Sequence, residues 1–179
     1  FGVWGMTSAF AQNKIKYFSS APNYTPNYPA GGSRLAHFHR TWGDKPFYWK
    51  SASGQDSVLY WATGTGYSLF HSWIFDRLAV CGLDPIWDIL DDLETGEYAY
   101  PITYMRYTIH GDNGPPDSEM ADVIRKWNEI YDYPRFSIST MENVFRELED
   151  RYGKMLPSYA GDLSPVWEDG AASSARELA

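Results

Sequence analysis

Two short runs of the chain combine carboxylate side chains with turn-forming residues, which is the combination that an active-site loop requires. The run from Tyr159 to Glu177 reads YAGDLSPVWEDGAASSARE and carries Asp162, Trp167 and Asp169 among glycines and a proline. Because glycine and proline turn the backbone sharply, these side chains are expected to project from it. The run is therefore predicted to form the wall of a pocket.

A second run of this kind, IHGDNGPPD, spans Ile109–Asp117 and follows a segment with a strand-like pattern. Its glycines allow a tight turn and its two prolines stiffen it, so the carboxylate of Asp112 would be held on a rigid loop. An aspartate here could instead cap the following helix, but Asp117 is predicted to fill that role. Asp112 is therefore the candidate for chemistry in this run.

The elements expected to position these runs alternate between strand and helix in the C-terminal half of the chain. This order predicts an α/β fold with parallel strands joined by crossover helices. Ligands in such folds gather beyond the carboxyl ends of the strands, so we expect Asp112, Asp162 and Asp169 to converge on one side of the sheet. Periodicity predicts helices over Trp4–Lys14, Ser68–Cys81, Pro85–Leu93, Ser118–Tyr131 and Met141–Tyr152, the last capped by Thr140. It predicts strands over Ile15–Ser19, Phe47–Trp49, Val58–Ala62, Ile102–Ile109 and Arg135–Ser139, the second and third forming a hairpin.

Composition restricts the classes of function. The 179 residues are enough for one domain, and no apolar run approaches the roughly 20 residues of a membrane helix, so no membrane partner is expected. A net charge of -8 without a basic stripe argues against a nucleic-acid partner. Aromatic residues make up 17% of the chain, which suits sugar binding but equally a bulky core.

Other groups of residues give weaker evidence for a functional site. His37 and His39 form an H-x-H pair that could bind a metal on a strand, but they lie in a predicted loop without a third partner. His71 falls on a predicted helix and is expected to be an ordinary packed or surface residue. The lone Cys81 excludes an internal disulfide and a zinc-thiolate cluster. The run TGTGYS lacks the lysine of a phosphate-binding loop, and no Gly-x-Ser-x-Gly elbow is present.

Several segments resemble the N-terminal catalytic domain of family-38 glycoside hydrolases, the class II α-mannosidases, and especially their bacterial-type relatives. The resemblance covers nearly the whole chain, and its most specific blocks are WNEIYDYP and YAGDLSPVWEDGAASSARE. It implies a seven-stranded, barrel-like α/β domain, one zinc ion that holds sugar hydroxyls, and retaining cleavage of an α-mannoside. The leading hypothesis takes Asp112 as the acid/base candidate, although strict family position would place the acid at Asn113. Its substrate-binding candidates are His110, Asn113, Asp162, Trp167 and Asp169.

The resemblance also implies that this chain is one incomplete segment of that domain. The family's H-x-D zinc motif and its nucleophilic aspartate precede the region that resembles Phe1–Met6, and a further histidine ligand lies beyond Ala179. Zinc is therefore expected in the intact parent protein, with its ligands outside this chain, and the isolated segment is expected to be inactive.

One position departs from the family pattern, which has Gly-Asp-Asp where this chain has Gly111, Asp112 and Asn113. An asparagine cannot donate a proton as a carboxylic acid does. Three alternatives follow: Asp112 acts through a shifted loop, the acid comes from elsewhere, or the chemistry differs. A catalytically silent carbohydrate-binding protein of the same fold is the second hypothesis, and a structural α/β domain without a ligand is the third.

The expected partner is a carbohydrate, an α-mannoside. A segment of a barrel exposes strand edges and apolar surface, so association into a homo-oligomer is also an expectation. The compartment is left open, with a slight preference for a secreted or periplasmic one.

Overall fold

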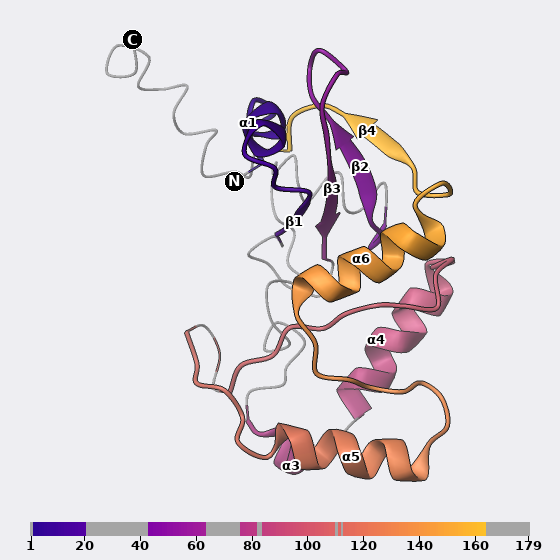
Figure 1. Ribbon diagram of the computed structural model, residues 1–179. Coiled ribbons are helices and arrows are strands. Elements are labelled where there is room, and N and C mark those ends of the chain that lie inside the picture. The colour runs from indigo at the N-terminus through magenta and orange to yellow at the C-terminus, as the bar shows by residue number, and fades with distance from the viewer. Residues whose placement is uncertain are drawn as a thin grey trace. The chain divides into compact units, whose positions relative to one another are not determined.

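The computed structural model describes residues 2–20, 43–63, 76–81, 84–109, 111 and 113–163. The chain divides into two compact units, each of which is described by itself. The sheet unit comprises Phe1–Gly64 and Tyr152–Ala179, and the helical unit comprises Thr65–Arg151 (Figure 1). The predicted α/β class is confirmed, with helices and one open mixed sheet in the described residues.

The sheet unit contains four strands in the spatial order β1-β3-β2-β4. Strands β2 (Phe47–Lys50) and β3 (Ser57–Ala62) form an antiparallel hairpin, as predicted from the turn-forming residues between them. The outer strands β1 (Tyr17–Ser20) and β4 (Ser158–Ala160) run parallel to β3 and β2 respectively. Helix α1 (Met6–Gln12) precedes β1 and confirms the predicted helix over Trp4–Lys14.

These pairings place the strand ends at two opposite edges of the sheet. Because β1 and β3 are parallel neighbours, both end at one edge, which we call the β1/β3 edge. Because β2 runs against β3, it ends at the other edge, and its parallel neighbour β4 ends there too. We call this the β2/β4 edge.

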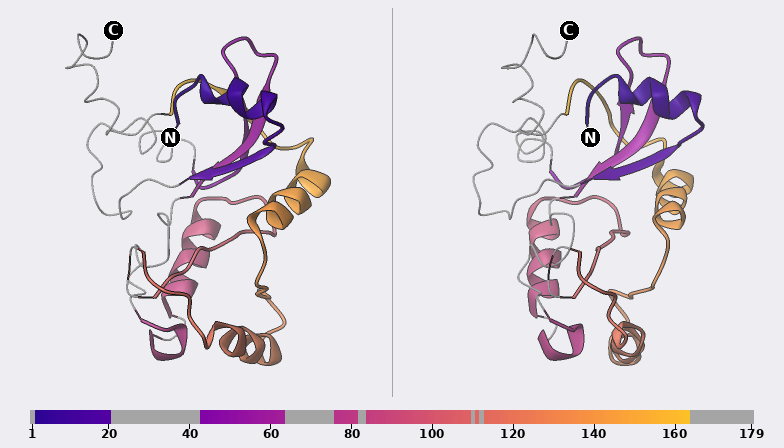
Figure 2. Two further views of the ribbon diagram at one scale, coloured as in Figure 1. Left: turned by 60° about the vertical axis from the view of Figure 1, so that its left-hand side comes forward. Right: turned by 90° about the vertical axis from the view of Figure 1, so that its left-hand side faces the viewer.

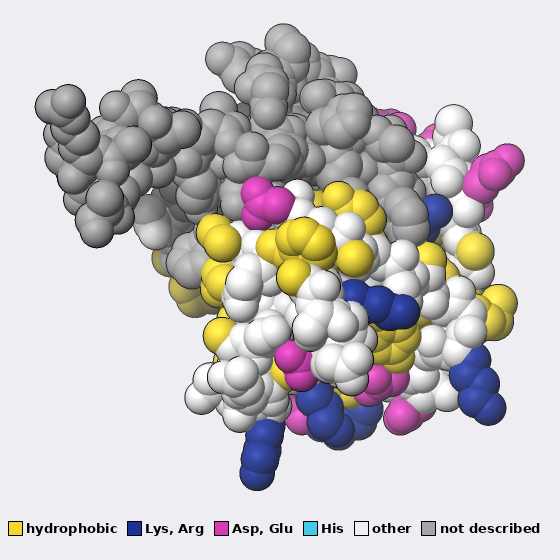
Figure 3. All heavy atoms as spheres, turned by 90° about the horizontal axis from the view of Figure 1, so that it is seen from above, with side chains coloured by type: hydrophobic (Ala, Val, Ile, Leu, Met, Phe, Trp, Pro, Cys, Tyr) yellow, Lys and Arg dark blue, Asp and Glu magenta, His cyan; other side chains and the backbone are white. Residues whose placement is uncertain are grey.

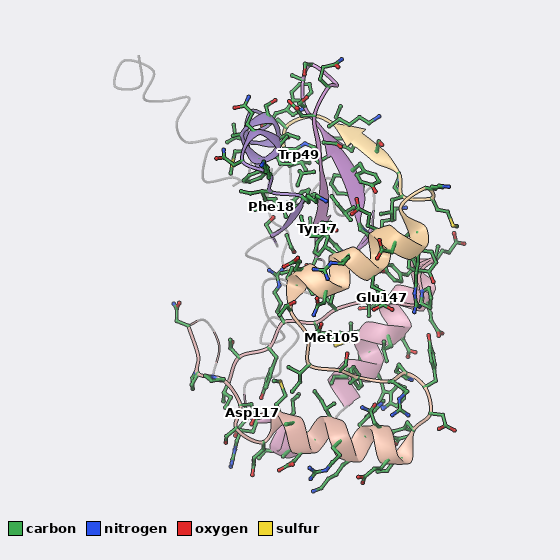
Figure 4. The ribbon with its side chains drawn as sticks, viewed as in Figure 1. Tyr17, Phe18, Trp49, Met105, Asp117 and Glu147 are labelled. Atoms are coloured by element: carbon green, nitrogen blue, oxygen red, sulfur yellow. The ribbon has the colours of Figure 1, made fainter. Side chains whose placement is uncertain are left out.

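Aromatic side chains fill the interior of the sheet unit. Phe47, Trp49 and Tyr60 are fully buried on adjacent strands, and the ring centroids of Trp49 and Tyr60 lie 5.4 Å apart. Phe18 of β1 stacks on Tyr60, and Phe10 of α1 lies against Phe18. Figure 2 shows α1 beside the strands, and Figure 4 shows Phe18 and Trp49 among the side chains of the sheet. The described aromatic residues of this unit therefore build a core, as ordinary interiors do.

The helical unit contains four described helices. They are α3 (Leu78–Cys81), α4 (Asp84–Thr95), α5 (Met120–Ile130) and α6 (Met141–Tyr152). Helix α6 begins as predicted, because Thr140 Oγ1 accepts the amide of Asn143 at 3.3 Å, and it buries Phe145 and Leu148. Of the predicted helix over Ser68–Cys81, only residues 76–81 are described, and there the helix begins at Leu78.

The predicted strands over Ile102–Ile109 and Arg135–Ser139 are wrong for this structure, because neither segment belongs to a ladder in the described residues. Side chains contact their backbone in place of a neighbouring strand. Asn128 of α5 accepts the amide of Phe136 at 3.0 Å and donates to its carbonyl at 2.8 Å. The hydroxyl of Tyr98 donates to the carbonyl of Ile102 at 2.7 Å.

Among the residues that the structure describes, no helix is long and apolar enough to span a membrane. Figure 3 shows Lys and Arg side chains interspersed with Asp and Glu on the described part of one face. Basic side chains gather into no stripe on that part of the surface.

Candidate functional site

Asp162 lies two residues beyond the end of β4, at the β2/β4 edge, and its carboxylate is part of a connection to the N-terminal segment. Its Oδ1 accepts the backbone amide of Trp4 at 3.1 Å. The indole of Trp49 donates to the carbonyl of Gly161 at 2.8 Å, and the amide that follows Asp162 donates to the carbonyl of Gly2 at 2.9 Å. The half-buried carboxylate is therefore fixed in place by a backbone donor.

The same edge carries further polar contacts. The indole of Trp4 donates to the carbonyl of Lys50 at 2.8 Å, and the hydroxyl of Ser8 donates to Asp56 Oδ2 at 2.9 Å. The amide of Asp56 donates to the hydroxyl of Ser51 at 3.2 Å. These contacts hold the start of the chain, the hairpin turn and the end of β4 together. Trp167 and Asp169, which were predicted to complete the pocket wall, lie outside the described residues.

The β1/β3 edge carries polar groups that the sequence analysis missed. The hydroxyls of Ser20 and Tyr60 lie 2.5 Å apart, and Ser19 donates to the carbonyl of Trp61 at 2.9 Å. The indole of Trp61 donates to Asp44 Oδ1 at 2.5 Å. The sequence shows two adjacent serines, Ser19 and Ser20, where a predicted strand ends. Their hydrogen-bond partners depend on which strand lies beside them, and the sequence does not show that strand. Parallel strands that end together form the edge where α/β folds bind ligands.

In the helical unit, hydrogen bonds connect described residues of the run that was predicted to carry the acid/base. The amide of Ile109 donates to the carbonyl of Pro115 at 3.0 Å, which joins the two ends of the loop. Inside it, Gly111 accepts two hydrogen bonds at its carbonyl oxygen, from the amide of Gly114 at 3.2 Å and from Thr108 Oγ1 at 2.8 Å. His110 and Asp112, which belong to this run in the sequence, lie outside the described residues. We call the described residues of this run, 109, 111 and 113–115, the closed loop.

Backbone conformation explains three residue types in the closed loop. Gly111 has a φ of 113° and Asn113 a φ of 58°, in the left-handed region that asparagine tolerates better than most residues with a Cβ. A Cβ at Gly114 would lie 1.6 Å from the carbonyl oxygen of Ile109, so only glycine fits there. Asn113 is exposed. Its identity therefore has a conformational reason that is independent of proton transfer.

Asp117 lies just beyond the closed loop and is 7% exposed (Figure 4). Its Oδ1 accepts the amide of Glu119 at 2.9 Å, and its Oδ2 accepts the amide of Leu78 at 3.1 Å and lies 3.0 Å from the hydroxyl of Tyr107. The predicted helix cap is therefore corrected: α5 begins at Met120, and Asp117 binds the amide of the residue before it. The carboxylate also binds the first amide of α3, a partner 39 positions away in sequence.

These contacts set the charge state of Asp117. Burial alone would raise the pKa of this carboxyl group, because it removes water from the ionised form. The amides of Glu119 and Leu78, the hydroxyl of Tyr107 and the charge of Arg77 act in the opposite direction, and together they lower the pKa below its ordinary value. Asp117 is therefore an anion that its partners stabilise.

A cavity of about 960 Å³ lies inside the helical unit. Helices α4, α5 and α6 line it together with the two extended segments that were predicted as strands, and Figure 4 labels Met105 and Glu147 from its lining. Aromatic and charged side chains both contribute, among them Trp127, Arg106 and Glu147. Asn113, the predicted site residue that the structure describes in this unit, does not line the cavity.

Nothing in the described residues fits the zinc ion that the family resemblance implies. Across residues 2–20, 43–63, 76–81, 84–109, 111 and 113–163 there is no group of three or more His, Cys, Asp or Glu side chains that could hold a metal. His37, His39, His71 and the run TGTGYS lie outside those residues.

The predicted site residues are thus distributed over two units. Asn113 belongs to the helical unit and Asp162 to the sheet unit, so their convergence on one site stays a prediction. Comparison with known proteins adds no identification: no family model, no curated protein and no solved structure matches the chain.

Proposed function

We propose that the chain is a segment of the catalytic domain of a zinc-dependent, retaining α-mannosidase-like glycoside hydrolase, in which Asp112 is the acid/base. The observation that carries the proposal is the closed loop, whose described residues flank Asp112 in the sequence. Its ends are joined by the bond from Ile109 to Pro115, and its backbone adopts a left-handed conformation at Asn113. Residues other than glycine that adopt this conformation cluster at functional sites.

The proposed chemistry divides between this chain and residues outside it. A retaining glycosidase needs two carboxyl groups roughly 5 Å apart, one as nucleophile and one as acid/base. Asp112 would protonate the glycosidic oxygen as the bond breaks and then accept a proton from the water that releases the sugar. The nucleophile and the zinc ligands would come from residues outside this chain, within a complete seven-stranded domain. Zinc would hold sugar hydroxyls there, and no step assigned to this chain passes through it.

The conformational role of Asn113 supports Asp112 as the acid. The family pattern places a carboxylate at the second position after the glycine, where this chain has Asn113. Its φ of 58° gives this residue a backbone function, and it leaves Asp112 as the carboxyl group that the closed loop flanks in the sequence. Asp162, fixed on the amide of Trp4, would act as a binding residue with Trp167 and Asp169.

The test uses the longer protein that contains this chain. The proposal expects an H-x-D motif and then an aspartate shortly before Phe1, and turnover of α-mannosides by the purified protein. Asp112→Asn should lower kcat on an α-mannosyl disaccharide by roughly 100-fold to 10,000-fold, because a general acid contributes about that much. An aryl α-mannoside with an activated leaving group should lose less, since its departure needs no proton.

Asn113→Asp is the matched variant, because it restores the family pattern one position away. If Asp112 is the acid, this variant should leave the loss caused by Asp112→Asn unrepaired in the double mutant. Recovery of activity in the double mutant would assign the acid to position 113. Equal losses on both substrates for Asp112→Asn would argue for a binding or structural role instead.

The cavity in the helical unit favours one second candidate, a catalytically silent carbohydrate-binding protein. A volume of about 960 Å³ suits a small oligosaccharide, and the lining offers both aromatic faces and charged hydrogen-bonding groups. Glu147→Gln should then weaken binding of an α-mannosyl disaccharide measured by calorimetry. Glu142→Gln is its control, since both glutamates pair with an arginine four residues later on α6, and Glu142 does not line the cavity.

A further inference from the structure

We propose that Asn113 and Gly114 form a deamidation site, where the side-chain amide of Asn113 becomes a carboxylate without the help of an enzyme and at a rate set by opening of the closed loop. Asparagine is a chemically labile residue in proteins. The reaction needs water as its only co-reactant, so the site is independent of the proposed mannosidase activity.

The reaction begins at the backbone nitrogen of Gly114. This nitrogen loses its proton to the solvent and attacks Cγ of Asn113, which closes a succinimide ring. The side-chain nitrogen of Asn113 takes up a proton and leaves as ammonia. Water then opens the ring at either carbonyl and leaves aspartate or isoaspartate, whose backbone runs through the side-chain carbon. Ammonia leaves and water enters, so no oxidant or reductant takes part.

The residue after Asn113 makes this pair reactive. Glycine has no Cβ to obstruct the approach of its nitrogen to the preceding side chain. Every other asparagine of the chain precedes a lysine, tyrosine, glutamate or valine, whose side chains obstruct that approach: Asn13, Asn23, Asn27, Asn128 and Asn143. The fold also requires the glycine, because a Cβ at Gly114 would lie 1.6 Å from the carbonyl oxygen of Ile109. The closed loop therefore keeps the reactive pair.

The side chain of Asn113 is open to water. The residue is exposed, and its φ of 58° places it in a tight turn of the backbone. Asn128 is a contrasting case, because its side chain is half-buried and binds both the amide and the carbonyl of Phe136, at 3.0 Å and 2.8 Å. Water and the expelled ammonia therefore have access to Asn113 that Asn128 lacks.

The closed loop controls the rate through the attacking nitrogen. The amide of Gly114 donates to the carbonyl of Gly111 at 3.2 Å, and the bond from Ile109 to Pro115 at 3.0 Å joins the ends of the loop. The nitrogen must give up the proton that it donates and move toward Cγ of Asn113, so the loop must open first. One or two hydrogen bonds should slow the reaction by about 10-fold to 100-fold relative to the unfolded chain.

The experiment incubates the longer protein in mildly alkaline buffer, folded or unfolded in guanidinium chloride, and follows the peptide with Asn113 by mass spectrometry. That peptide should gain about 1 Da as ammonia is exchanged for water. Conversion should be about 10-fold to 100-fold slower in the folded protein. Asn143 is the internal control, since it is also exposed but precedes Val144 within α6, and in the unfolded protein it should convert more slowly than Asn113.

Two results would overturn the proposal. Equal rates in the folded and unfolded protein would remove the control by the loop. An intact Asn113 in the folded protein, after about 100 times the period that the unfolded protein needs, would remove the site. The Asn113→Asp protein provides the chromatographic standard for the aspartate product, so that isoaspartate is recognised as a second peak of the same mass.

Hydrogen exchange measures the opening of the loop directly. The amide of Gly114 exchanges only when its bond to Gly111 is open, so its protection factor should match the slowing of deamidation within about 10-fold. A larger difference would show that another constraint sets the rate. None of these measurements uses mannoside turnover, so the failure of the deamidation site and the failure of the proposed function are distinguishable.

Discussion

The two units of this chain both have an apolar core, but they differ in how their extended segments are held. In the sheet unit, paired strands carry aromatic side chains that fill the interior, with Phe47, Trp49 and Tyr60 fully buried. In the helical unit, two extended segments without a ladder border a cavity of about 960 Å³, and a buried carboxylate, Asp117, connects elements that are distant in sequence. A ladder supplies a flat surface on which large side chains pack. The described residues of the helical unit have no ladder, and there side-chain hydrogen bonds to the extended segments add to the apolar packing around Leu78, Ile86 and Ile89.

This difference predicts that the two units respond to different perturbations. Apolar packing in the sheet unit should be sensitive to loss of volume, and the β2/β3 ladder, whose bonds join backbone groups, should be insensitive to acid. The helical unit should tolerate changes at exposed positions but respond to the charge of one aspartate and to the space at one glycine. Each of the following experiments can contradict that distinction.

The largest effect is expected for Trp49→Ala. The indole is 0% exposed, lies 5.4 Å from Tyr60 and donates to the carbonyl of Gly161, so its removal creates a cavity and leaves an acceptor without its partner. The free energy of unfolding should fall by about 3 to 5 kcal/mol, measured by denaturant titration. Tyr133→Ala is the control, because that ring is 74% exposed and should cost less than about 0.5 kcal/mol. Similar losses in both variants would contradict a filled aromatic core.

A smaller effect is expected for Gly114→Ala in the closed loop. The new Cβ would lie 1.6 Å from the carbonyl oxygen of Ile109, so the bond that closes the loop must open or shift. The change should destabilise the loop by about 1 to 3 kcal/mol, measured as faster exchange of the Ile109 amide. Gly5→Ala, where the added Cβ would meet no atom within 4 Å beyond its chain neighbours, should leave that amide unchanged. Unchanged exchange in Gly114→Ala would show that the loop is not closed in this way.

Acid should distinguish the two units through Asp117. Because the pKa of this carboxyl group is lower in the folded protein than in the unfolded chain, its ionised form stabilises the fold. That contribution is complete above the ordinary pKa of about 3.9, and it is lost as the pH falls below this value and through the lower folded pKa. Asp117→Asn should cost about 1 to 2 kcal/mol at pH 7 and should flatten the acid limb of the stability curve.

Hydrogen exchange of individual amides as a function of pH tests the same effect of Asp117 residue by residue. The amides of Leu78 and Glu119 donate to Asp117, so their protection should fall in acid, after correction for the intrinsic exchange rate. Amides of the β2/β3 ladder should keep their protection over the same range. A parallel loss of protection in both units would contradict the distinction between a packed and a charge-dependent interior.

Sequence reasoning identified the elements whose signals are local. Turn residues between two apolar runs predicted the β2/β3 hairpin, and Thr140 predicted the start of α6. Alternation over Ile102–Ile109 predicted a strand, but alternation reports which side chains face inward and not whether a partner strand is present. The side-chain amide of Asn128 binds the backbone amide and carbonyl of Phe136, where a strand was expected. No spacing in the sequence signals that contact.

For the candidate site too, the sequence predicted the local features and missed the contacts between distant residues. The sequence identifies the run IHGDNGPPD as a stiff turn, and the structure closes it through Ile109 and Pro115. The bond from Leu78 to Asp117 spans 39 positions, and the contact of Ser20 with Tyr60 requires the register that pairs Phe18 with Tyr60. Both depend on tertiary placement, which composition and periodicity do not encode residue by residue.

The smallest effect is expected for the ion pair between Arg146 and Glu142 on the exposed side of α6. The two side chains are four residues apart, in the order that places the acid toward the helix N-terminus, which favours both the pair and the helix dipole. Glu142→Gln should cost only about 0.3 to 0.5 kcal/mol, since water screens exposed charges and ordering two long side chains opposes the attraction. The loss should shrink in 1 M salt, where screening acts within a few ångströms, whereas the cost of Trp49→Ala should not. Both variants are compared by denaturant titration at low and high salt. A salt-independent loss above about 1 kcal/mol for Glu142→Gln would show that Glu142 stabilises the helical unit by more than an exposed ion pair.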